Sequence, residues 1–329
     1  MSALAASFDD PVLEARVQGT IERVETLLRE QCSAPEPFIA EAATHLLSAG
    51  GKRFRPMLAA LSAEFGDPSR PEVVPAAVVV ELTHLATLYH DDVMDEADKR
   101  RGAASANARW DNALAVLVGD YLFGRVSELV ADLGPDMVRI QAQTFTRLVR
   151  GQIRETVGPA EGEDRLAHYL DVVSDKTGSL IATTARFGAR MSGASTEVED
   201  ALTEFGERIG SAFQLADDVI DIASETDDSG KTPGTDLREG VPTLPTLLAQ
   251  RSTDPADARL LDLLSRPLHD DAEVTEALAL LRVHPAMDEA RAHVQAEADA
   301  ARALLGKLPD TAARRALDDV CDVVVTRLG

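Results

Sequence analysis

The 329-residue sequence contains only two cysteines, Cys32 and Cys321, which lie nearly a whole chain apart. It has no CxxC pair and no Cys/His cluster, so neither a disulfide framework nor a zinc site is expected. Aromatic residues are also few, at 4% of the chain, and the single tryptophan and six methionines have no spacing typical of a cofactor or nucleic-acid platform. The cysteine usage predicts a reducing, cytoplasmic setting.

Positive charge is scarce as well. The chain has 33 lysines and arginines against 56 aspartates and glutamates, which gives a formal net charge of −23. This charge repels nucleic acid and anionic lipid, so we expect no nucleic-acid partner, and an anionic substrate needs its own basic pocket or a bound metal ion. No basic segment with a following apolar stretch opens the sequence, and the apolar runs are far shorter than a membrane span of about 20 residues. We therefore expect a soluble protein without a transmembrane segment.

Helical periodicity dominates what is present. Apolar residues recur at three- and four-residue spacing over most of the length, and Ala, Leu, Glu and Arg fill the periodic stretches. Breaks with glycine or proline, such as Gly50–Gly51, Gly134–Pro135 and Leu308–Pro309, divide the chain into about ten helices. No break is long or polar enough to be a flexible interdomain linker. The sequence predicts an all-α fold in a single domain.

One helix-forming stretch carries closely spaced carboxylates. Residues 91–95 read Asp-Asp-Val-Met-Asp, a DDxxD motif, within an apolar segment. Asp91 and Asp95 lie one helical turn apart, on the same face as His84. Two carboxylates in this arrangement can share a cation.

The same motif occurs a second time, in residues 217–221, which read Asp-Asp-Val-Ile-Asp. Gln214 lies one turn before Asp217 and either points its carbonyl dipole into a cleft or is a satisfied core amide. Two solvated acidic helix faces are the alternative interpretation of the two motifs. It is disfavoured because both copies lie among apolar residues, where repelling carboxylates are costly without a counter-ion. Hard, oxygen-binding cations are expected between them, and magnesium is the natural choice.

Basic residues gather near these motifs. Residues 50–56 read Gly-Gly-Lys-Arg-Phe-Arg-Pro, a tight loop whose glycines let the backbone approach a ligand and whose guanidinium groups can bind phosphate bidentately. Residues 99–102, Lys-Arg-Arg-Gly, follow the first motif, and single lysines stand in 176–178 and 230–231. A helix end or a surface lysine explains each segment alone but hardly the whole set. Because phosphate and carboxylate repel each other, the set indicates a phosphorylated ligand held through metal ions.

In their order along the chain, these segments resemble the trans-isoprenyl diphosphate synthases of the polyprenyl synthetase family, from roughly Phe38 to the C-terminus. The matching segments include GGKRFRP, DDVMD, KRRG, GDYL, GQIRE, KTGS, FQLADDVID and GKTPGTDL. The resemblance implies an isoprenoid-synthase helical bundle around a central active-site cavity. It assigns residues 38–329 to the catalytic domain and residues 1–37 to a variable N-terminal segment, and it implies a homodimer.

The reaction implied by the resemblance is a magnesium-dependent, head-to-tail condensation of isopentenyl diphosphate with an allylic diphosphate. In such enzymes three magnesium ions are bound by the first and last aspartates of the first motif and the first aspartate of the second. The corresponding residues are Asp91, Asp95 and Asp217. The expected helpers are Asp92, Asp218 and Asp221.

The resemblance also implies the substrate-binding residues. Those for isopentenyl diphosphate are Lys52, Arg55, His84 and Arg101. Arg53 is a further substrate-binding residue that is assigned to neither substrate. Those for the allylic diphosphate are Arg100, Lys176 and Lys231. Thr177 and Gln214 are expected to stabilise the allylic cation by their dipoles. One departure is Val241, where many members have a lysine, so the second lysine contact of those members is left open here.

Product length depends on the residues one turn before Asp91, which are Ala86 and Thr87. In the family, bulky aromatic residues at these positions block the growing chain, whereas small ones let it elongate. The resemblance therefore implies a long-chain product, which would serve as a quinone side chain or carrier lipid and could reach the membrane. The alternatives are a farnesyl- or geranylgeranyl-producing synthase, a terpene cyclase, a regulatory subunit of a heteromeric synthase, and a helical scaffold that binds nothing.

Overall fold

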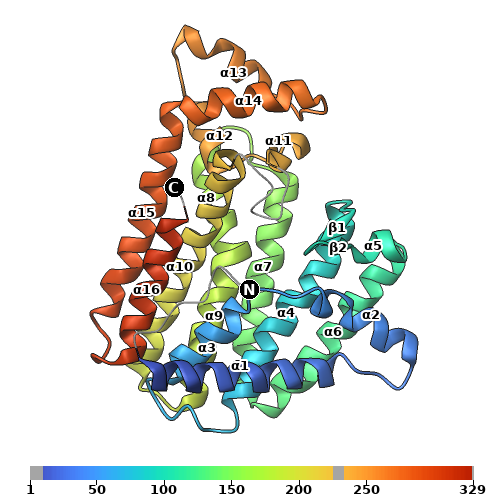
Figure 1. Cartoon of the computed structure of the whole chain (residues 1–329), viewed down its shortest axis with the longest axis vertical. Coiled ribbons are helices and arrows are strands. Elements are labelled where there is room, and N and C mark those ends of the chain that lie inside the picture. Colours follow the sequence, from blue (N-terminus) through green and yellow to red (C-terminus); the bar gives the residue numbers. More distant parts are fainter. Residues whose placement is uncertain (1–9, 225–232, 328–329) are drawn as a thin grey trace. The chain divides into compact units, whose positions relative to one another are not determined.

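Helices make up most of the computed structural model, which describes residues 10–224 and 233–327 (Figure 1). The all-α prediction is confirmed, since 77% of the residues are helical. Internal contacts divide the chain into two compact units, and the first consists of the described residues 10–145, 180–206 and 304–319. The second consists of the described residues 146–179, 207–224, 233–303 and 320–327. The assignment of residues 38–329 to one catalytic domain stays a prediction.

The first unit is built around α4 (Val73–Met94), a long apolar helix. By length and composition alone α4 could cross a membrane, but 78% of its most apolar stretch is buried inside the protein, as is usual for a core helix. The other helices that begin in this unit are α1 (Pro11–Gln31), α2 (Pro37–Ser48), α3 (Phe54–Ala63), α5 (Ala106–Arg109), α6 (Asn112–Asp132), α7 (Pro135–Val157), α10 (Thr196–Ala223) and α16 (Ala312–Thr326). Most of α9 (Ser179–Ser192) also belongs to it.

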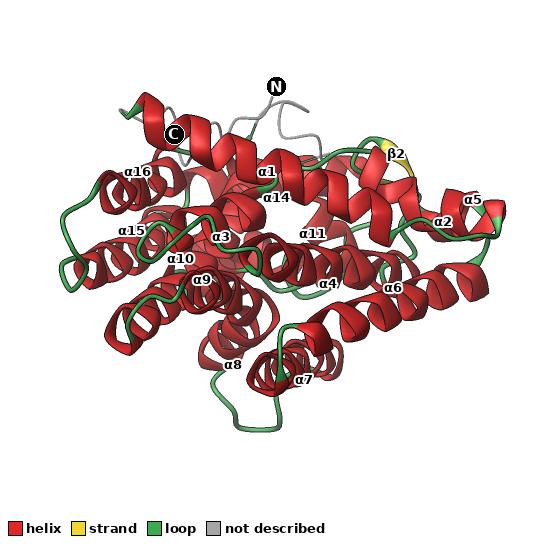
Figure 2. Ribbon diagram, turned by 90° about the horizontal axis from the view of Figure 1, so that it is seen from below, coloured by secondary structure: helices red, strands yellow, loops and turns green. Residues whose placement is uncertain are grey.

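Helix α1 packs across α3 and α4 (Figure 2). Asp10 begins it by accepting hydrogen bonds from the backbone N–H groups of Val12 and Leu13, which would otherwise lack partners. Its buried side chains recur at helical spacing and include Leu13, Val17, Val24 and Leu28. Although α1 lies within the segment expected to be variable, it contributes directly to the core of this unit.

A short hairpin follows α4. Its strands β1 (Lys99–Arg100) and β2 (Ala103–Ala104) pair antiparallel, with Arg100 opposite Ala103. In the turn, Gly102 has a φ of 79° and Arg101 a φ of 53°. The left-handed region costs glycine little but is unusual for arginine. The hairpin therefore folds two arginines back toward the end of α4 at some backbone cost.

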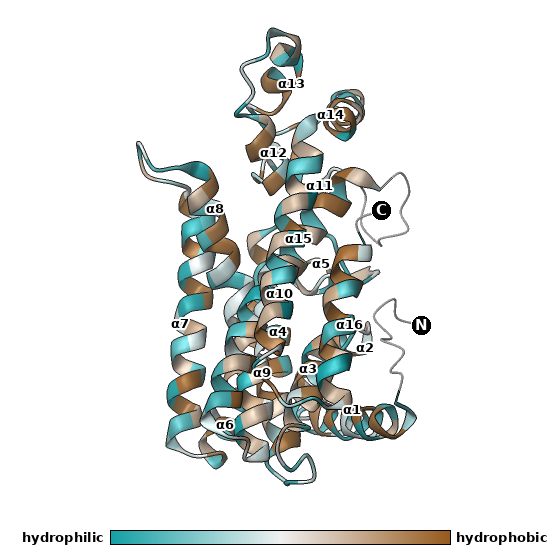
Figure 3. Ribbon diagram, turned by 90° about the vertical axis from the view of Figure 1, so that its left-hand side faces the viewer, coloured by the Kyte–Doolittle hydropathy of each residue, from teal (hydrophilic) through white to brown (hydrophobic). Residues whose placement is uncertain are grey.

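The second unit includes the remainder of α7, α10 and α16 and most of α15 (Pro285–Leu305). Along α7 and α10, hydrophilic and hydrophobic residues alternate as expected for amphipathic helices (Figure 3). The further helices of this unit are α8 (Arg165–Val173), the π-helical turn η1 (Ser174–Gly178), α11 (Thr235–Glu239), α12 (Leu244–Ala249), the 3₁₀ turn η3 (Pro255–Asp257), α13 (Ala258–Leu263) and α14 (Asp271–Val283).

The described residues form sixteen α-helices, more than the ten or so expected. The additional helices are short, and they are α5, α11, α12 and α13. Segments of one or two turns are too short for periodicity to reveal. Their starts depend on local caps instead, such as the reciprocal hydrogen bonds of Thr243 and Thr246 that open α12. The predicted breaks at Gly134–Pro135 and Leu308–Pro309 do separate long helices.

Candidate active site

The first aspartate motif lies at the C-terminal end of α4, in the first unit. Asp91 is half-buried, and Asp95 is an exposed C-cap whose backbone N–H donates to the carbonyl of Asp91 at 2.8 Å. Asp92 is fully buried and accepts hydrogen bonds from Nε of Arg100 at 2.6 Å and from the backbone N–H of Ala106 at 3.1 Å. The first and last aspartates are therefore accessible to a cation, whereas Asp92 anchors the hairpin and α5.

Arg100 also approaches the accessible part of this motif. Its Nη2 lies 3.3 Å from Oδ2 of Asp95, in addition to its hydrogen bond with Asp92. Burial lowers the pKa of Arg100, but the neighbouring carboxylates outweigh burial and raise its pKa overall. A positive charge thus stands beside a carboxylate that was predicted to bind metal.

Arg53 of the basic loop is held by two carboxylates. It has a left-handed φ of 50° and precedes α3. Its guanidinium pairs with Glu25 from α1 and lies 3.3 Å from Oε1 of Glu81 on α4. At Gly51, a Cβ would lie 2.6 Å from Nη1 of Arg53 and 3.2 Å from Cζ of Arg101. The loop backbone at Gly51 thus lies close to these two guanidinium groups, and a side chain there would require the arginine side chains to shift.

Arg55 and Arg101 carry positive charge that is less fully compensated. Nε of Arg55 is buried and has no hydrogen-bond partner within the described part of the chain. Arg101 donates from Nη1 to the backbone carbonyls of Leu46, at 3.0 Å, and Gly50. Burial lowers the pKa of both arginines. A buried cationic nitrogen that no protein acceptor satisfies is typical of a site for an anion.

His84 and Lys52, also predicted to bind substrate, lie in the same unit. Burial, together with the charges of Arg55 and Arg101, lowers the pKa of His84 well below its usual range, so its ring is neutral at physiological pH. Lys52 is exposed in the basic loop. A neutral imidazole keeps one N–H donor, which suits it to hydrogen-bond an anion without adding charge.

Ala86 and Thr87, the predicted determinants of product length, lie on α4. Ala86 is fully buried. Its backbone carbonyl oxygen lies 3.2 Å from where a Cβ on Gly119 of α6 would be, so the two helices approach closely there. Thr87 is half-buried, and its hydroxyl donates to the carbonyl of His84 at 2.8 Å. The hydroxyl of Thr87 is thereby used within the helix.

The second aspartate motif lies near the C-terminal end of α10, in the second unit. The side chain of Asp217 is 38% exposed, and its Oδ1 accepts a hydrogen bond from Nη2 of Arg327 at 2.6 Å. The guanidinium of Arg327 also lies 4.6 Å from the centre of the Phe213 ring, a cation–π distance. Arg327 is not predictable from the sequence, because a single arginine outside any motif gives no signal of a role.

Asp218 is enclosed by the protein, like Asp92 in the first motif. It is 6% exposed, and it accepts hydrogen bonds from the hydroxyl of Tyr169 and from Nε2 of Gln214, the latter at 3.1 Å. Burial, with a smaller contribution from the charge of Asp236, raises the pKa of Asp218 to about 7. Asp221 is 9% exposed. Asp217 is therefore the most accessible carboxylate of this motif.

Lys176 and Thr177 stand on the π-helical turn η1, in the same unit as the second motif. The ammonium group of Lys176 pairs with Glu155 of α7. The hydroxyl of Thr177 donates to Oε1 of Gln214 at 3.3 Å. Thr177 and Gln214, which the resemblance assigns to stabilising the allylic cation, are therefore in contact with each other. Lys231, the remaining predicted lysine, lies outside the described residues.

The donor atoms suit magnesium, although residues 10–224 and 233–327 contain no group of three Asp, Glu, His or Cys side chains that could hold a metal ion. Magnesium commonly binds through one or two carboxylates, while phosphate oxygens and water complete its octahedral shell. The carboxylates of Asp91 and Asp95, and separately that of Asp217, are oxygen donors of this kind. The residues present therefore fit Mg²⁺ that binds together with a diphosphate.

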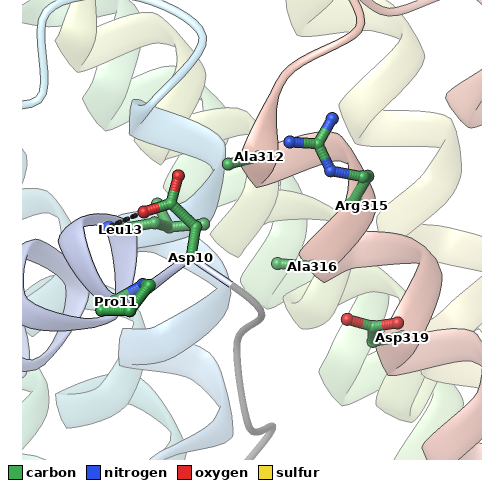
Figure 4. A pocket seen from close by; sticks show the side chains of 7 residues that line it. All are labelled: Asp10, Pro11, Leu13, Ala312, Arg315, Ala316 and Asp319. Atoms are coloured by element: carbon green, nitrogen blue, oxygen red, sulfur yellow. Dashed lines mark hydrogen bonds between the residues drawn. The ribbon is translucent and has the colours of Figure 1, made fainter.

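A surface pocket of about 230 Å³ lies in the first unit, where the N-terminal ends of α1 and α16 approach each other (Figure 4). Asp10 and Arg315 flank it from opposite sides. Its lining residues are Asp10, Pro11, Leu13, Ala312, Arg315, Ala316 and Asp319. None of the predicted site residues is among them, so we assign this pocket no part in the active site.

Comparisons with known proteins agree with these features. The model of the polyprenyl synthetase family matches residues 36–281. A nonaprenyl diphosphate synthase of Mycobacterium tuberculosis is 51% identical over 97% of this chain and 96% of its own length. A dimethylallyltranstransferase of the same organism is 42% identical over 98% of each chain.

Solved structures show the same relationship. The geranylgeranyl pyrophosphate synthase of Corynebacterium glutamicum, crystallised with calcium and isoprenyl diphosphate, is 49% identical and superposes with a TM-score of 0.89. The match covers 98% of this chain and 99% of that one. These relatives are named as synthases or a transferase, which does not favour the terpene cyclase, the regulatory subunit or the helical scaffold that binds nothing. With a matching family model over most of its length and full-length relatives at these identities, the chain belongs to the polyprenyl synthetase family of prenyltransferases.

Proposed function

We propose that this prenyltransferase condenses isopentenyl diphosphate head-to-tail with an allylic diphosphate, uses Mg²⁺, and releases a long all-trans polyprenyl diphosphate. The observation that carries the proposal is the buried Nε of Arg55, which has no hydrogen-bond partner among the described residues. A diphosphate oxygen would satisfy it through a strong, charge-assisted hydrogen bond. The homologous synthase crystallised with calcium and isoprenyl diphosphate supports a divalent metal and this substrate class.

Isopentenyl diphosphate is assigned to the basic residues of the first unit. Arg55 and Arg101 supply guanidinium donors, Lys52 adds an ammonium group, and neutral His84 adds an N–H. Arg53 contributes less directly, because Glu25 and Glu81 already balance its charge. This set binds the diphosphate and leaves the terminal double bond free to react.

The metal-binding carboxylates are assigned to Asp91, Asp95 and Asp217, which would hold three Mg²⁺ ions together with the allylic diphosphate. Bound Mg²⁺ supplies the positive charge that stabilises a leaving diphosphate when the allylic C–O bond breaks. Arg100 would have to give up its contact with Asp95 as the ions bind, and its guanidinium then becomes available to the diphosphate.

The remaining assignments concern the allylic substrate. Lys176 and Lys231 bind its diphosphate, while Thr177 and Gln214 direct their dipoles at the carbocation. The hydrogen bond between these two polar side chains supports a shared task. The double bond of isopentenyl diphosphate attacks the cation, and the proton lost afterwards goes to the released diphosphate, since the motifs provide no evident protein base.

Two similar relatives are named for products of different chain length. The nonaprenyl diphosphate synthase, at 51% identity, supports a long product, as do the small residues Ala86 and Thr87. The geranylgeranyl pyrophosphate synthase, at 49% identity, supports a shorter one and is the second candidate. We favour the long product because α4 presents no aromatic side chain at these two positions.

The test is a product assay. Purified protein is incubated with Mg²⁺, radiolabelled isopentenyl diphosphate and farnesyl or geranylgeranyl diphosphate, and the products are dephosphorylated and sized. A metal-dependent ladder that ends at one long prenol supports the proposal. A stop at geranylgeraniol selects the shorter-chain candidate, and no incorporation of isopentenyl units contradicts both.

We further propose a cytoplasmic homodimer. Helix α6 exposes Val116 and Leu117, at 39% and 61%, next to one another on the surface of the first unit. Exposed apolar neighbours of this kind are typical of interfaces, and a second copy of the chain is the partner that the family resemblance implies. Light scattering on wild type and Leu117→Glu tests this: a monomeric wild type would contradict the proposal.

A further inference from the structure

The GQIRE motif, residues 151–155, approaches the proposed machinery at Lys176, with which Glu155 pairs, but the motif itself has been given no role. It lies on α7, beside the π-helical turn η1 that carries Lys176 and Thr177. A π-turn takes up one residue more than an α-helical turn and therefore redirects the side chains it carries. Such a turn is rare and needs support from its surroundings.

The first support is a buried carboxylate within the turn. Asp175 is 5% exposed. Its Oδ1 accepts a hydrogen bond from Nε of Arg147 at 3.0 Å, and its Oδ2 accepts from Nε and Nη2 of Arg150 at 2.9 and 2.6 Å. A buried carboxylate is stable only when it is paired and hydrogen-bonded. Two arginines of α7 thus fix the turn from one side.

The second support comes from α10. Glu207 accepts hydrogen bonds from Nη1 and Nη2 of Arg147, at 3.0 and 2.6 Å, and from the hydroxyl of Ser174 at 2.6 Å. Hydrogen bonding to Glu207 raises the pKa of Arg147. The guanidinium of Arg147 therefore links α7, the turn and α10. It donates to Asp175 through Nε and to Glu207 through both Nη atoms.

The third support is steric. At Gly151, a Cβ would lie 2.7 Å from the backbone nitrogen of Lys176 and 3.1 Å from Cβ of Asp175. No real Cβ approaches a backbone atom so closely, so any side chain there would push the turn away from α7. Gly124 on α6 provides the contrast, since its added Cβ would meet no atom within 4 Å.

We propose that Arg147, Asp175 and Glu207 are positioning residues that hold η1 as a π-turn, and that Gly151 allows the contact, so that Lys176 and Thr177 are aimed at the allylic diphosphate and its cation. The inference rests on the proposed function, which assigns Lys176 to the allylic diphosphate and Thr177 to the cation. The positioning residues themselves act only through the turn.

The first experiment compares Gly151→Ala with the matched control Gly124→Ala. The readouts are kcat, the KM for each substrate, and calorimetric binding of farnesyl thiolodiphosphate, an unreactive allylic analogue. For Gly151→Ala we expect about a 10- to 100-fold loss in kcat over allylic KM, the scale of a misplacement near 1 Å. Analogue binding should weaken, while the KM for isopentenyl diphosphate and all parameters of Gly124→Ala stay close to wild type.

A second pair, Arg147→Lys and Arg147→Gln, keeps the test decisive if Gly151→Ala does not fold. Lysine retains the charge but not the fork, so Arg147→Lys should recover part of the allylic affinity that Arg147→Gln loses. Wild-type allylic kinetics in Gly151→Ala, or equal loss of both substrate affinities in the Arg147 variants, would overturn the proposal. An inactive wild type would instead refute the proposed function.

Discussion

Asp92 and Asp218 hold the same place in their motifs, and both are buried and bonded to protein groups, the first to Arg100 and Ala106 and the second to Tyr169 and Gln214. Asp95 and Asp217 have side chains 44% and 38% exposed. A buried carboxylate whose two oxygens both accept protein hydrogen bonds is a poor metal ligand, because binding a cation would break both inside the protein. Asp95 and Asp217 each have one oxygen in a partly exposed ion pair, which a cation can displace at lower cost. Each motif therefore combines accessible carboxylates with one that holds the local structure together.

Removing an accessible carboxylate should affect turnover rather than folding. We expect Asp91→Ala or Asp217→Ala to lower kcat by at least ~100-fold, the scale lost with a key electrostatic stabiliser of a transition state. The far-ultraviolet circular dichroism of both variants should match wild type. Near-normal activity in both would sink the assignment of these aspartates.

Arg327 places a positive charge on Asp217 where the proposed metal would bind. Removing it should make Mg²⁺ binding in the absence of diphosphate tighter by up to about fivefold, since a partly exposed ion pair contributes at most ~1 kcal/mol. Calorimetric titration of Arg327→Gln with Mg²⁺ measures this. Arg208→Gln, which breaks the ion pair with Glu297 elsewhere in the second unit, is the control. Unchanged or weaker Mg²⁺ binding in Arg327→Gln would contradict the competition.

His84 should make the stability of the protein depend on pH. Its folded-state pKa is lowered well below 6.5 by burial and by the nearby arginines. Below about pH 6.5 the unfolded chain binds a proton at His84 that the folded chain does not, so stability is complete above that pH and is lost as pH falls. Between pH 6.5 and 5, wild type should lose up to about 1.4 kcal/mol per pH unit more than His84→Gln.

Urea denaturation at several pH values gives the free energies of unfolding for this comparison. The exposed His269 supplies the control, and His269→Gln should follow wild type across the range. Parallel curves for wild type and His84→Gln would mean that His84 is not held neutral in the folded protein.

Among the helices, the crossing of α9 over α3 depends on one glycine. At Gly188, a Cβ would lie 2.2 Å from the carbonyl oxygen of Ala59, which is backbone and cannot rotate away. Gly188→Ala should therefore destabilise the protein by about 1–3 kcal/mol or more. Gly19→Ala on α1, where no atom lies within 4 Å, should instead stabilise it by up to about 1 kcal/mol. Equal shifts in the denaturation midpoints of the two variants would exclude a steric cause.

The sequence was a good guide to the long helices, because their apolar spacing and their glycine and proline breaks are local signals. The motifs also assign Thr177 and Gln214 to the same task, stabilising the allylic cation, and the two side chains are hydrogen-bonded in the structure. Tyr169 and Arg327 were missed because their aspartate partners lie 49 and 110 residues away in sequence, and only tertiary packing joins them. Arg53 was expected to bind substrate, and its pairing with two glutamates was equally invisible in the sequence.

For the whole molecule, a net charge of −23 must be reconciled with two diphosphate substrates. Binding these anions requires positive charge that carboxylates do not already neutralise, and many of the arginines are in ion pairs with carboxylates. Arg55 and Arg101 stand out: Nε of Arg55 has no hydrogen-bond acceptor in the described part of the chain, and Nη1 of Arg101 donates to backbone carbonyls. The anion-binding capacity of an acidic protein is thus concentrated in a few buried guanidinium groups, and Mg²⁺ supplies the rest of the charge when it arrives with the diphosphate.

Product length is the property of the whole enzyme that a single residue on α4 should change. Ala86→Phe adds a ring at a residue that is fully buried and whose backbone lies close to α6. If the growing chain passes there, the ladder of products should end several isoprene units earlier, while the first condensation is retained. The ring also overpacks the helix contact, at a cost of about 1–3 kcal/mol.

Thr87→Phe separates these effects, because Thr87 is half-buried and its position should tolerate a ring with less strain. Shortened products in both variants would place the path of the chain along this face of α4. Val283→Phe, at the exposed C-terminal end of α14, should leave the product unchanged. If both α4 variants make the wild-type product with wild-type thermal stability, the chain must elongate along another face, and the small residues at 86 and 87 would serve helix packing alone.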